Sequence, residues 1–299
     1  MAIIKNKEER KGVLFLLASA FIYSTMPVFI RTLGGAGLPP TAQVFLRYIF
    51  AFLAAIVYFG LTNKAKVKVK SKDVLPLLGL TVFGYGLMNL FFTLGILNTQ
   101  IGNALFLFYS YAIITPILGL IFLKDKINKF NIVAVIFSGI ALILLFQPNS
   151  LPTWKIGGLF AILASFGQAG YLILRKVLKD YPANFIMLAN TFVGLIILGV
   201  LSFVFENKFY FQGGIMNMSI NTWVTTIILG LANFFAWFAM TKGFEYFKAT
   251  AASIILLSEL IFGIFFAFTF FHEIPTYATF FGGFLILISS VVVITRGEN

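Results

Sequence analysis

The sequence contains no cysteine, one histidine and only ten acidic residues among 299. Without cysteine, the chain can form no disulfide framework, no thiolate metal site and no cysteine nucleophile. An intramembrane enzyme needs clustered acids, histidines or a nucleophile beside a base. The single histidine, His272, precedes Glu273 in an expected loop, and this pair is interpreted as solvated. We therefore expect no catalysis, no metal and no cofactor.

Basic residues exceed acidic ones by 12, but they lie in short clusters between apolar runs. This pattern marks membrane topology and does not predict nucleic-acid binding. Most of the Lys and Arg residues fall in alternate loops, and the other loops hold Arg31, Lys155 and Lys208. The bias places both termini in the cytoplasm.

Apolar residues are abundant: 60% of the chain is hydrophobic, and phenylalanine alone contributes 38 residues. Such a composition is typical of a polytopic membrane protein whose partner is the lipid bilayer. Each of ten apolar runs is long enough to cross a bilayer with some tilt. They lie at about 12–33, 40–61, 73–97, 102–123, 130–146, 157–178, 182–205, 220–247, 249–271 and 275–295. The first run is too long for a signal peptide and is expected to be retained.

The two halves of the chain share short segments in the same order. GLMNLF at 86–91 recurs as GLANFF at 230–235, and FLKD at 122–125 is echoed by FFHE at 270–273. Leu14, Phe15 and Arg31 have counterparts in Leu159, Phe160 and Arg175. Because each half holds an odd number of spans, the copies must be inverted across the membrane. We predict an all-α integral membrane protein of ten transmembrane helices, with five-helix repeats at 1–148 and 149–299 around a central cavity.

Three segments resemble the EamA-type drug/metabolite transporters. RYIFAFLA at 47–54 is similar to the second-helix signature of that family, and the junctions at 98–104 and 244–252 are similar to its helix 3–4 and helix 8–9 patterns. The resemblance covers nearly the whole chain. It implies a bacterial or archaeal plasma (inner) membrane protein that moves small organic solutes without ATP, often as an exporter of amino acids or drugs.

The chain departs from the family pattern in two places. Tyr23 and Ser24 stand where the first span often has Trp-Gly, while Ala112 and Leu260 stand where the fourth and ninth spans often have proline. Pro116 is then the residue expected to kink the fourth span.

Glu259 is the first candidate site residue because it lies near the middle of the apolar run at 249–271. An acid at that depth costs about 2.5–3.5 kcal/mol on insertion scales, so it should face a cavity or a partner. It is a candidate site for a cationic group or a coupling proton. The alternative is a structural pair with an arginine.

Arg47 is the natural partner for Glu259, or a ligand for a substrate carboxylate. It lies about 10 Å into the second span at 1.5 Å per residue, a depth from which its long side chain can approach Glu259. The alternatives are snorkelling to the interface and helix packing.

Polar residues on other spans complete the predicted substrate site. Tyr111 takes the position of Glu259 when the two halves are superposed. Asn89 with Tyr85, and Asn233 with Trp237, form i, i+4 pairs on single helix faces. Gln168 in the sixth span is the last candidate. The alternative for the amides is interhelical hydrogen bonding, worth about 0.6 kcal/mol per bond.

These residues predict a secondary active transporter that works by alternating access, most simply an exporter of small amphipathic metabolites such as amino acids or their analogues. A zwitterion would satisfy both Glu259 and Arg47. An organic-cation or drug transporter is the alternative within the class, and a non-transporting structural or lipid-handling membrane subunit is the alternative outside it. Direction, coupling ion and oligomeric state stay open.

Overall fold

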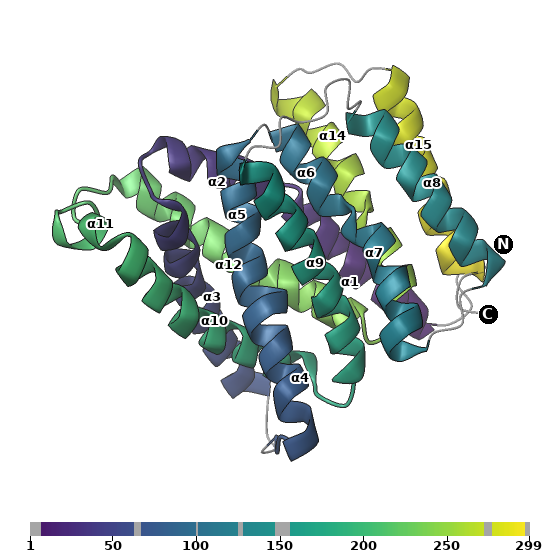
Figure 1. Ribbon diagram of the computed structural model, residues 1–299, viewed down its shortest axis with the longest axis horizontal. Coiled ribbons are helices and arrows are strands. Elements are labelled where there is room, and N and C mark those ends of the chain that lie inside the picture. Colours follow the sequence, from purple (N-terminus) through teal and green to yellow (C-terminus); the bar gives the residue numbers. More distant parts are fainter. Residues whose placement is uncertain are drawn as a thin grey trace.

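The computed structural model describes residues 7–62, 67–99, 101–124, 128–146, 156–271 and 277–296, and helices make up most of this part of the chain. No strand occurs within these described ranges, so the predicted all-α class is confirmed. The helices pack side by side along much of their length (Figure 1). His272 and Glu273 lie outside the described residues.

Six stretches of helix are long and apolar enough to cross a membrane. Two of these stretches combine several elements: one is α1 (Lys7–Tyr23) with α2 (Met26–Gly35), and the other is η1 (Ser71–Asp73), α4 (Val74–Gly79), η2 (Leu80–Leu87) and α5 (Met88–Asn98). The other four are single helices: α3 (Pro40–Thr62), α9 (Ile156–Val177), α10 (Ala183–Phe205) and α12 (Ile220–Gly243). The η2 segment is a π-helix, which carries Tyr85.

The remaining predicted spans correspond to shorter apolar helices in the described ranges. They are α6 (Ile101–Tyr109) with α7 (Tyr111–Leu118) and the π-helix η3 (Gly119–Leu123), α8 (Lys129–Phe146), α13 (Ala249–Leu256) with α14 (Ser258–Phe271), and α15 (Tyr277–Arg296). A further short helix, α11 (Asn207–Phe211), follows α10.

The expected continuous helix at 249–271 is instead two helices, separated at Leu257. There the backbone N–H of Leu257 bonds the carbonyl of Ile254 at 3.1 Å, and that of Leu260 bonds Leu257 at 3.0 Å, so the turn is tightened. The first half is interrupted in the same way at Ser110, whereas Pro116 lies inside α7. The break places Glu259 in the first turn of α14, where free N–H groups and the helix dipole favour a carboxylate.

One end of the bundle collects the basic residues, and we call it the basic end. At this end α1 begins, α3 ends, α9 ends and α12 ends. Side-chain contacts tie these ends together: Asn184 to Thr62, Tyr181 to Asp73, and Arg175 to Glu245. The described basic residues here include Arg10, Lys11, Lys70, Lys72, Lys176, Lys179, Lys242 and Lys248. Arg31 and Lys208 lie at the opposite end.

Helices from the two halves interleave. The α9 helix packs along η2, α5, α6 and α7, and we call this group the first bundle. The α1 helix packs along α12, α13 and α14, and we call this group, with α2, the second bundle. The α3 helix packs against α10 and α12, while α8 and α15 lie side by side at the edge of the molecule (Figure 1).

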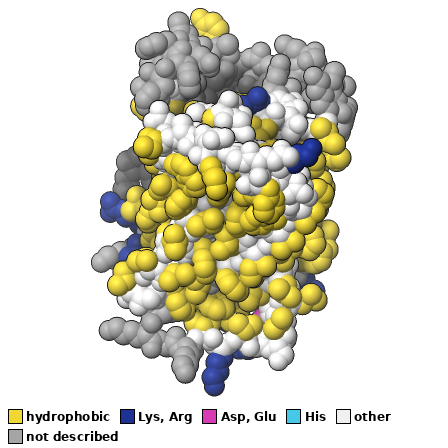
Figure 2. All heavy atoms as spheres, turned by 90° about the vertical axis from the view of Figure 1, so that its left-hand side faces the viewer, with side chains coloured by type: hydrophobic (Ala, Val, Ile, Leu, Met, Phe, Trp, Pro, Cys, Tyr) yellow, Lys and Arg dark blue, Asp and Glu magenta, His cyan; other side chains and the backbone are white. Residues whose placement is uncertain are grey.

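The outer faces of the helices are apolar. Figure 2 shows hydrophobic side chains spread over one face of the molecule, with Lys and Arg around its margins. Among the exposed side chains are Val57 on α3 and Val200 and Val204 on α10, each more than half exposed. Contiguous apolar surface of this kind on helices of this length is suited to contact with lipid.

A close approach between α12 and α3 depends on Gly230. A Cβ atom at this position would lie 2.6 Å from the backbone oxygen of Arg47, and backbone cannot rotate away. We therefore expect Gly230→Ala to cost about 1–3 kcal/mol through overpacking. The measurement is thermal unfolding of the purified protein in detergent. Gly170→Ala is the control, because a Cβ there meets nothing within 4 Å. An equal effect of both substitutions would contradict the packing argument.

Candidate functional site

A small cavity lies where the interrupted helices meet, and we call it the central cavity. Its volume is about 30 Å³. The helix breaks after Tyr23, at Ser110 and at Leu257 each adjoin a residue that lines this cavity. The residues that line the central cavity are Tyr23, Met88, Asn89, Phe92, Phe108, Tyr111, Gln168, Met240, Leu256 and Glu259. Four of the predicted site residues, Asn89, Tyr111, Gln168 and Glu259, are in this set.

Glu259 forms the acidic wall of the cavity. Its side chain is buried, with 6% of the residue exposed. The Tyr109 hydroxyl lies in hydrogen-bonding range of the carboxylate, and Tyr111 lies near enough to interact with it electrostatically. Tyr109 and Tyr111, on either side of the break at Ser110, therefore lie next to the acid.

Arg47 lies on α3 and is 1% exposed. Its Nη2 donates to Asn89 Oδ1 at 3.0 Å and to the Asn89 carbonyl at 3.3 Å. The ion pairs in the described part of the chain do not include Arg47 or Glu259. The structure thus holds the two charges apart, with Asn89 bound to Arg47 and lining the cavity that Glu259 also lines.

The other predicted residues form a layer behind the cavity. Asn233 Nδ2 donates to the Tyr85 hydroxyl at 3.1 Å. The rings of Tyr85 and Trp237 meet edge to face with centroids 4.6 Å apart, and Tyr23 meets Trp237 in the same manner at 5.9 Å. Tyr85 also contacts Asn89, whose Nδ2 donates to the Tyr85 carbonyl at 2.9 Å. Tyr85, Asn233 and Trp237 therefore connect to the cavity wall through Tyr23 and Asn89.

Several lining residues were not predicted from the sequence. One of them, Tyr23, stands at a position where the chain departs from the family pattern. Its hydroxyl is buried and has no hydrogen-bond partner within the described structure. The sequence could not identify Phe92, Phe108 and Met240 as lining residues, because apolar side chains of this kind are common in it and suit contact with lipid and with a cavity equally. Gln168 Nε2 reaches the Met240 sulfur at 3.4 Å.

The lining defines what the central cavity can bind. A carboxylate among aromatic rings suits a cationic group, because ring faces attract cations and the acid supplies charge. The amides of Asn89 and Gln168 are the lining groups that can donate to an acceptor oxygen, and Arg47 lies behind Asn89, to which it is bonded. A volume of about 30 Å³ holds water but no organic solute, so a solute enters only when the helices separate. No cluster of three or more metal-ligating acids or histidines occurs among the described residues.

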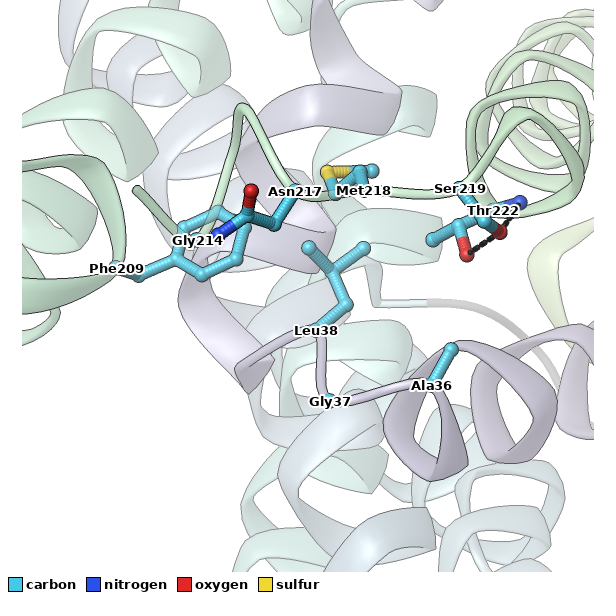
Figure 3. A pocket seen from close by; sticks show the side chains of 9 residues that line it. All are labelled: Ala36, Gly37, Leu38, Phe209, Gly214, Asn217, Met218, Ser219 and Thr222. Atoms are coloured by element: carbon cyan, nitrogen blue, oxygen red, sulfur yellow. Dashed lines mark hydrogen bonds between the residues drawn. The ribbon is translucent and has the colours of Figure 1, made fainter. Parts of the chain in front are cut away.

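A larger cavity, of about 360 Å³, lies at the end opposite the basic end (Figure 3). It is formed by the turn between α2 and α3 and the segment between α11 and α12. Figure 3 shows Leu38 and Met218 projecting into this space, with Ser219 and Thr222 bonded to each other at one side. No charged side chain is among its lining residues, all of which are described. By contrast, the lining of the central cavity includes the carboxylate of Glu259.

The fold and the site define a polytopic, membrane-embedded protein with a buried polar centre. The chain belongs to the EamA-like transporter family, whose sequence model matches residues 10–147 and again residues 155–295. The resemblance inferred from the sequence motifs is thereby confirmed. The family is one of membrane transporters, so the solute is a small molecule and the protein is not classed with enzymes.

Relatives extend over most of the chain at low identity. An uncharacterized transporter of Clostridium kluyveri is 24% identical over 84% of this chain and 83% of its own length. An S-adenosylmethionine uptake transporter of Rickettsia bellii is 23% identical over 95% and 93%. A solved crystal structure shares 12% identity and a TM-score of 0.76, covering 96% of this chain and 99% of the other. That last similarity concerns the fold alone.

Proposed function

We propose that this chain is a secondary active transporter that carries small amphipathic metabolites, chiefly amino acids or their analogues, out of the cell by alternating access. The observation that carries the proposal is the buried Glu259 at a helix break, in a cavity lined from both halves of the chain. Ionisable groups at such depth are usually tied to a transport path.

The substrate bears a positive group that binds at Glu259 among Tyr23, Phe108 and Tyr111. Its carboxylate reaches the donors of Asn89 and Arg47. The relatives named for S-adenosylmethionine uptake support this chemistry, because that compound combines a sulfonium cation with an amino-acid group. An organic cation without a carboxylate is the second candidate, favoured by the aromatic residues in the lining.

The architecture proposed for the cycle is ten transmembrane helices in two inverted repeats, 1–148 and 149–299. Both termini and the basic end face the cytoplasm of a bacterial or archaeal cell. The interleaving of helices between the halves supports such a repeat, as does the pair of helix breaks at Ser110 and Leu257. Glu259 accepts a proton in exchange for the cationic solute, which couples transport to the proton gradient.

A solute screen tests this function. Amino acids, sulfonium and quaternary ammonium compounds are ranked by thermal shift of the purified protein, and each hit is then measured as flux in proteoliposomes of known orientation. We expect zwitterionic solutes that carry an amine or an onium group to move, with the faster direction from the basic end outward. Absence of flux for every solute that binds would favour a structural or lipid-handling subunit. Faster uptake toward the basic end would favour import.

A further inference from the structure

Two arginines make related contacts at opposite ends of the molecule. Arg31, on α2, donates through Nη2 to the carbonyl of Thr99 in the turn between α5 and α6. Arg175, near the end of α9, lies within 3.2 Å of Glu245 Oε1 in the turn between α12 and α13. These arginines are counterparts in the two halves of the sequence, and the turns that they bind are counterparts as well.

Each arginine joins the two bundles at one end. Arg31 lies on α2, which packs against α12 of the second bundle and also against α5, and the turn it binds belongs to the first bundle. Arg175 lies on α9 in the first bundle, and the turn it binds belongs to the second. The Arg31 contact is at the end opposite the basic end, and the Arg175 contact is at the basic end. Residues of both bundles line the central cavity, and the two contacts lie beyond it toward opposite ends of the molecule.

We propose that Arg31 and Arg175 are the gating residues of the transport cycle. Release of the Arg31 contact opens the cavity toward the end opposite the basic end, while the Arg175 contact holds the other side closed. Release of Arg175 does the reverse. This inference rests on the alternating access of the proposed function. It accounts for the small central cavity, because both contacts are formed in this structure.

The two gates differ in strength. Arg175 is 2% exposed, donates to the Leu178 carbonyl at 2.9 Å and pairs with the Glu245 carboxylate. Glu245 is also bound by Lys242 at 2.7 Å, and Lys176 donates to the Phe244 carbonyl at 2.6 Å. Arg31 binds a neutral carbonyl. The guanidinium makes both gates charge-assisted, but the basic end has two long-range contacts, Arg175 to Glu245 and Lys176 to Phe244, and the first has a charged acceptor; the gate at the basic end is therefore the harder one to open.

The absence of cysteine from the chain allows a direct test. Leu256→Cys places one thiol in the central cavity. A membrane-impermeant maleimide is applied from either side of oriented vesicles, and the labelling rate reports which side is open. We expect Arg175→Gln to raise labelling from the basic end by about tenfold, the effect of losing one charge-assisted hydrogen bond. Arg31→Gln should raise labelling from the opposite side.

Two further variants keep the test decisive if Arg175→Gln folds poorly. Glu245→Gln should shift labelling to the same side by a smaller factor, because the glutamine side chain can still accept a hydrogen bond from Arg175. Lys179→Gln removes an exposed positive charge at the same end and should change nothing. Labelling that rises on the same side for Arg31→Gln and Arg175→Gln would overturn the proposal.

The labelling needs no substrate, so the gates and the proposed function can fail separately. Flux with unchanged labelling in the arginine variants would overturn the gates and leave the transporter. Opposite shifts in labelling without flux of any solute would support the gates and contradict the proposed function.

Discussion

Glu259→Gln is expected to reduce flux of the preferred solute by about 10- to 100-fold, because a hydrogen bond to a charged group is worth about 1.5–3 kcal/mol. The substitution keeps the shape of the side chain and removes its charge and its proton. Flux of the unmodified protein should vary with pH as the carboxylate exchanges its proton, and this variation should be lost in the variant. Initial rates in proteoliposomes across a pH series measure both effects.

The matched control is Glu9→Gln, which removes an acid from α1 near the basic end. It should leave both the rate and the pH profile unchanged. Tyr109→Phe removes the hydroxyl that lies in range of Glu259 and should alter the pH profile with a smaller loss of rate. Unchanged flux and pH dependence in Glu259→Gln would show that the central assignment is wrong.

Arg47→Gln is expected to separate two kinds of substrate. The substitution removes the buried charge that binds Asn89 and that we assign to the carboxylate of a zwitterion. Flux of amino acids or their analogues should fall by about 10- to 100-fold, on the same scale for charged hydrogen bonds. Flux of an organic cation without a carboxylate should fall much less. Paired flux assays on one preparation give the ratio.

Loss of a buried partner also destabilises a fold, so the ratio between substrates is the informative quantity. A folding defect lowers both fluxes by the same factor, whereas loss of a carboxylate ligand lowers one. Arg10→Gln, at an exposed position on α1, is the control for loss of positive charge. Equal losses for both substrate kinds would assign Arg47 to helix packing.

Much of the fold follows from local sequence properties. An apolar run of about 20 residues predicts a transmembrane helix whatever packs around it, because a helix forms its backbone hydrogen bonds within itself. For this reason the helices, their approximate bounds and the all-α class could be predicted. The break at Leu257 could not, because the sequence around it contains no proline or glycine.

The candidate site was predictable in part. Glu259 and Arg47 are rare charges in apolar runs, so each is conspicuous in the sequence alone. Their partners are not, because a long arginine side chain can reach several acceptors and the sequence does not rank them. In the structure, Arg47 donates a hydrogen bond to Asn89, and the Tyr109 hydroxyl lies in hydrogen-bonding range of Glu259.

By itself, the sequence determined that this is a helical membrane protein of the EamA-like family with one acid deep in an apolar run. Tertiary structure alone decided where that acid lies, which rings surround it, and that Arg31 and Arg175 reach across between bundles. The physical reason is that hydrophobic periodicity and charge bias act along the chain, whereas cavities and ion pairs depend on residues that are far apart in it. Phenylalanine and methionine are equally suited to lipid and to a cavity wall, so only packing could assign Phe108 and Met240 to the site.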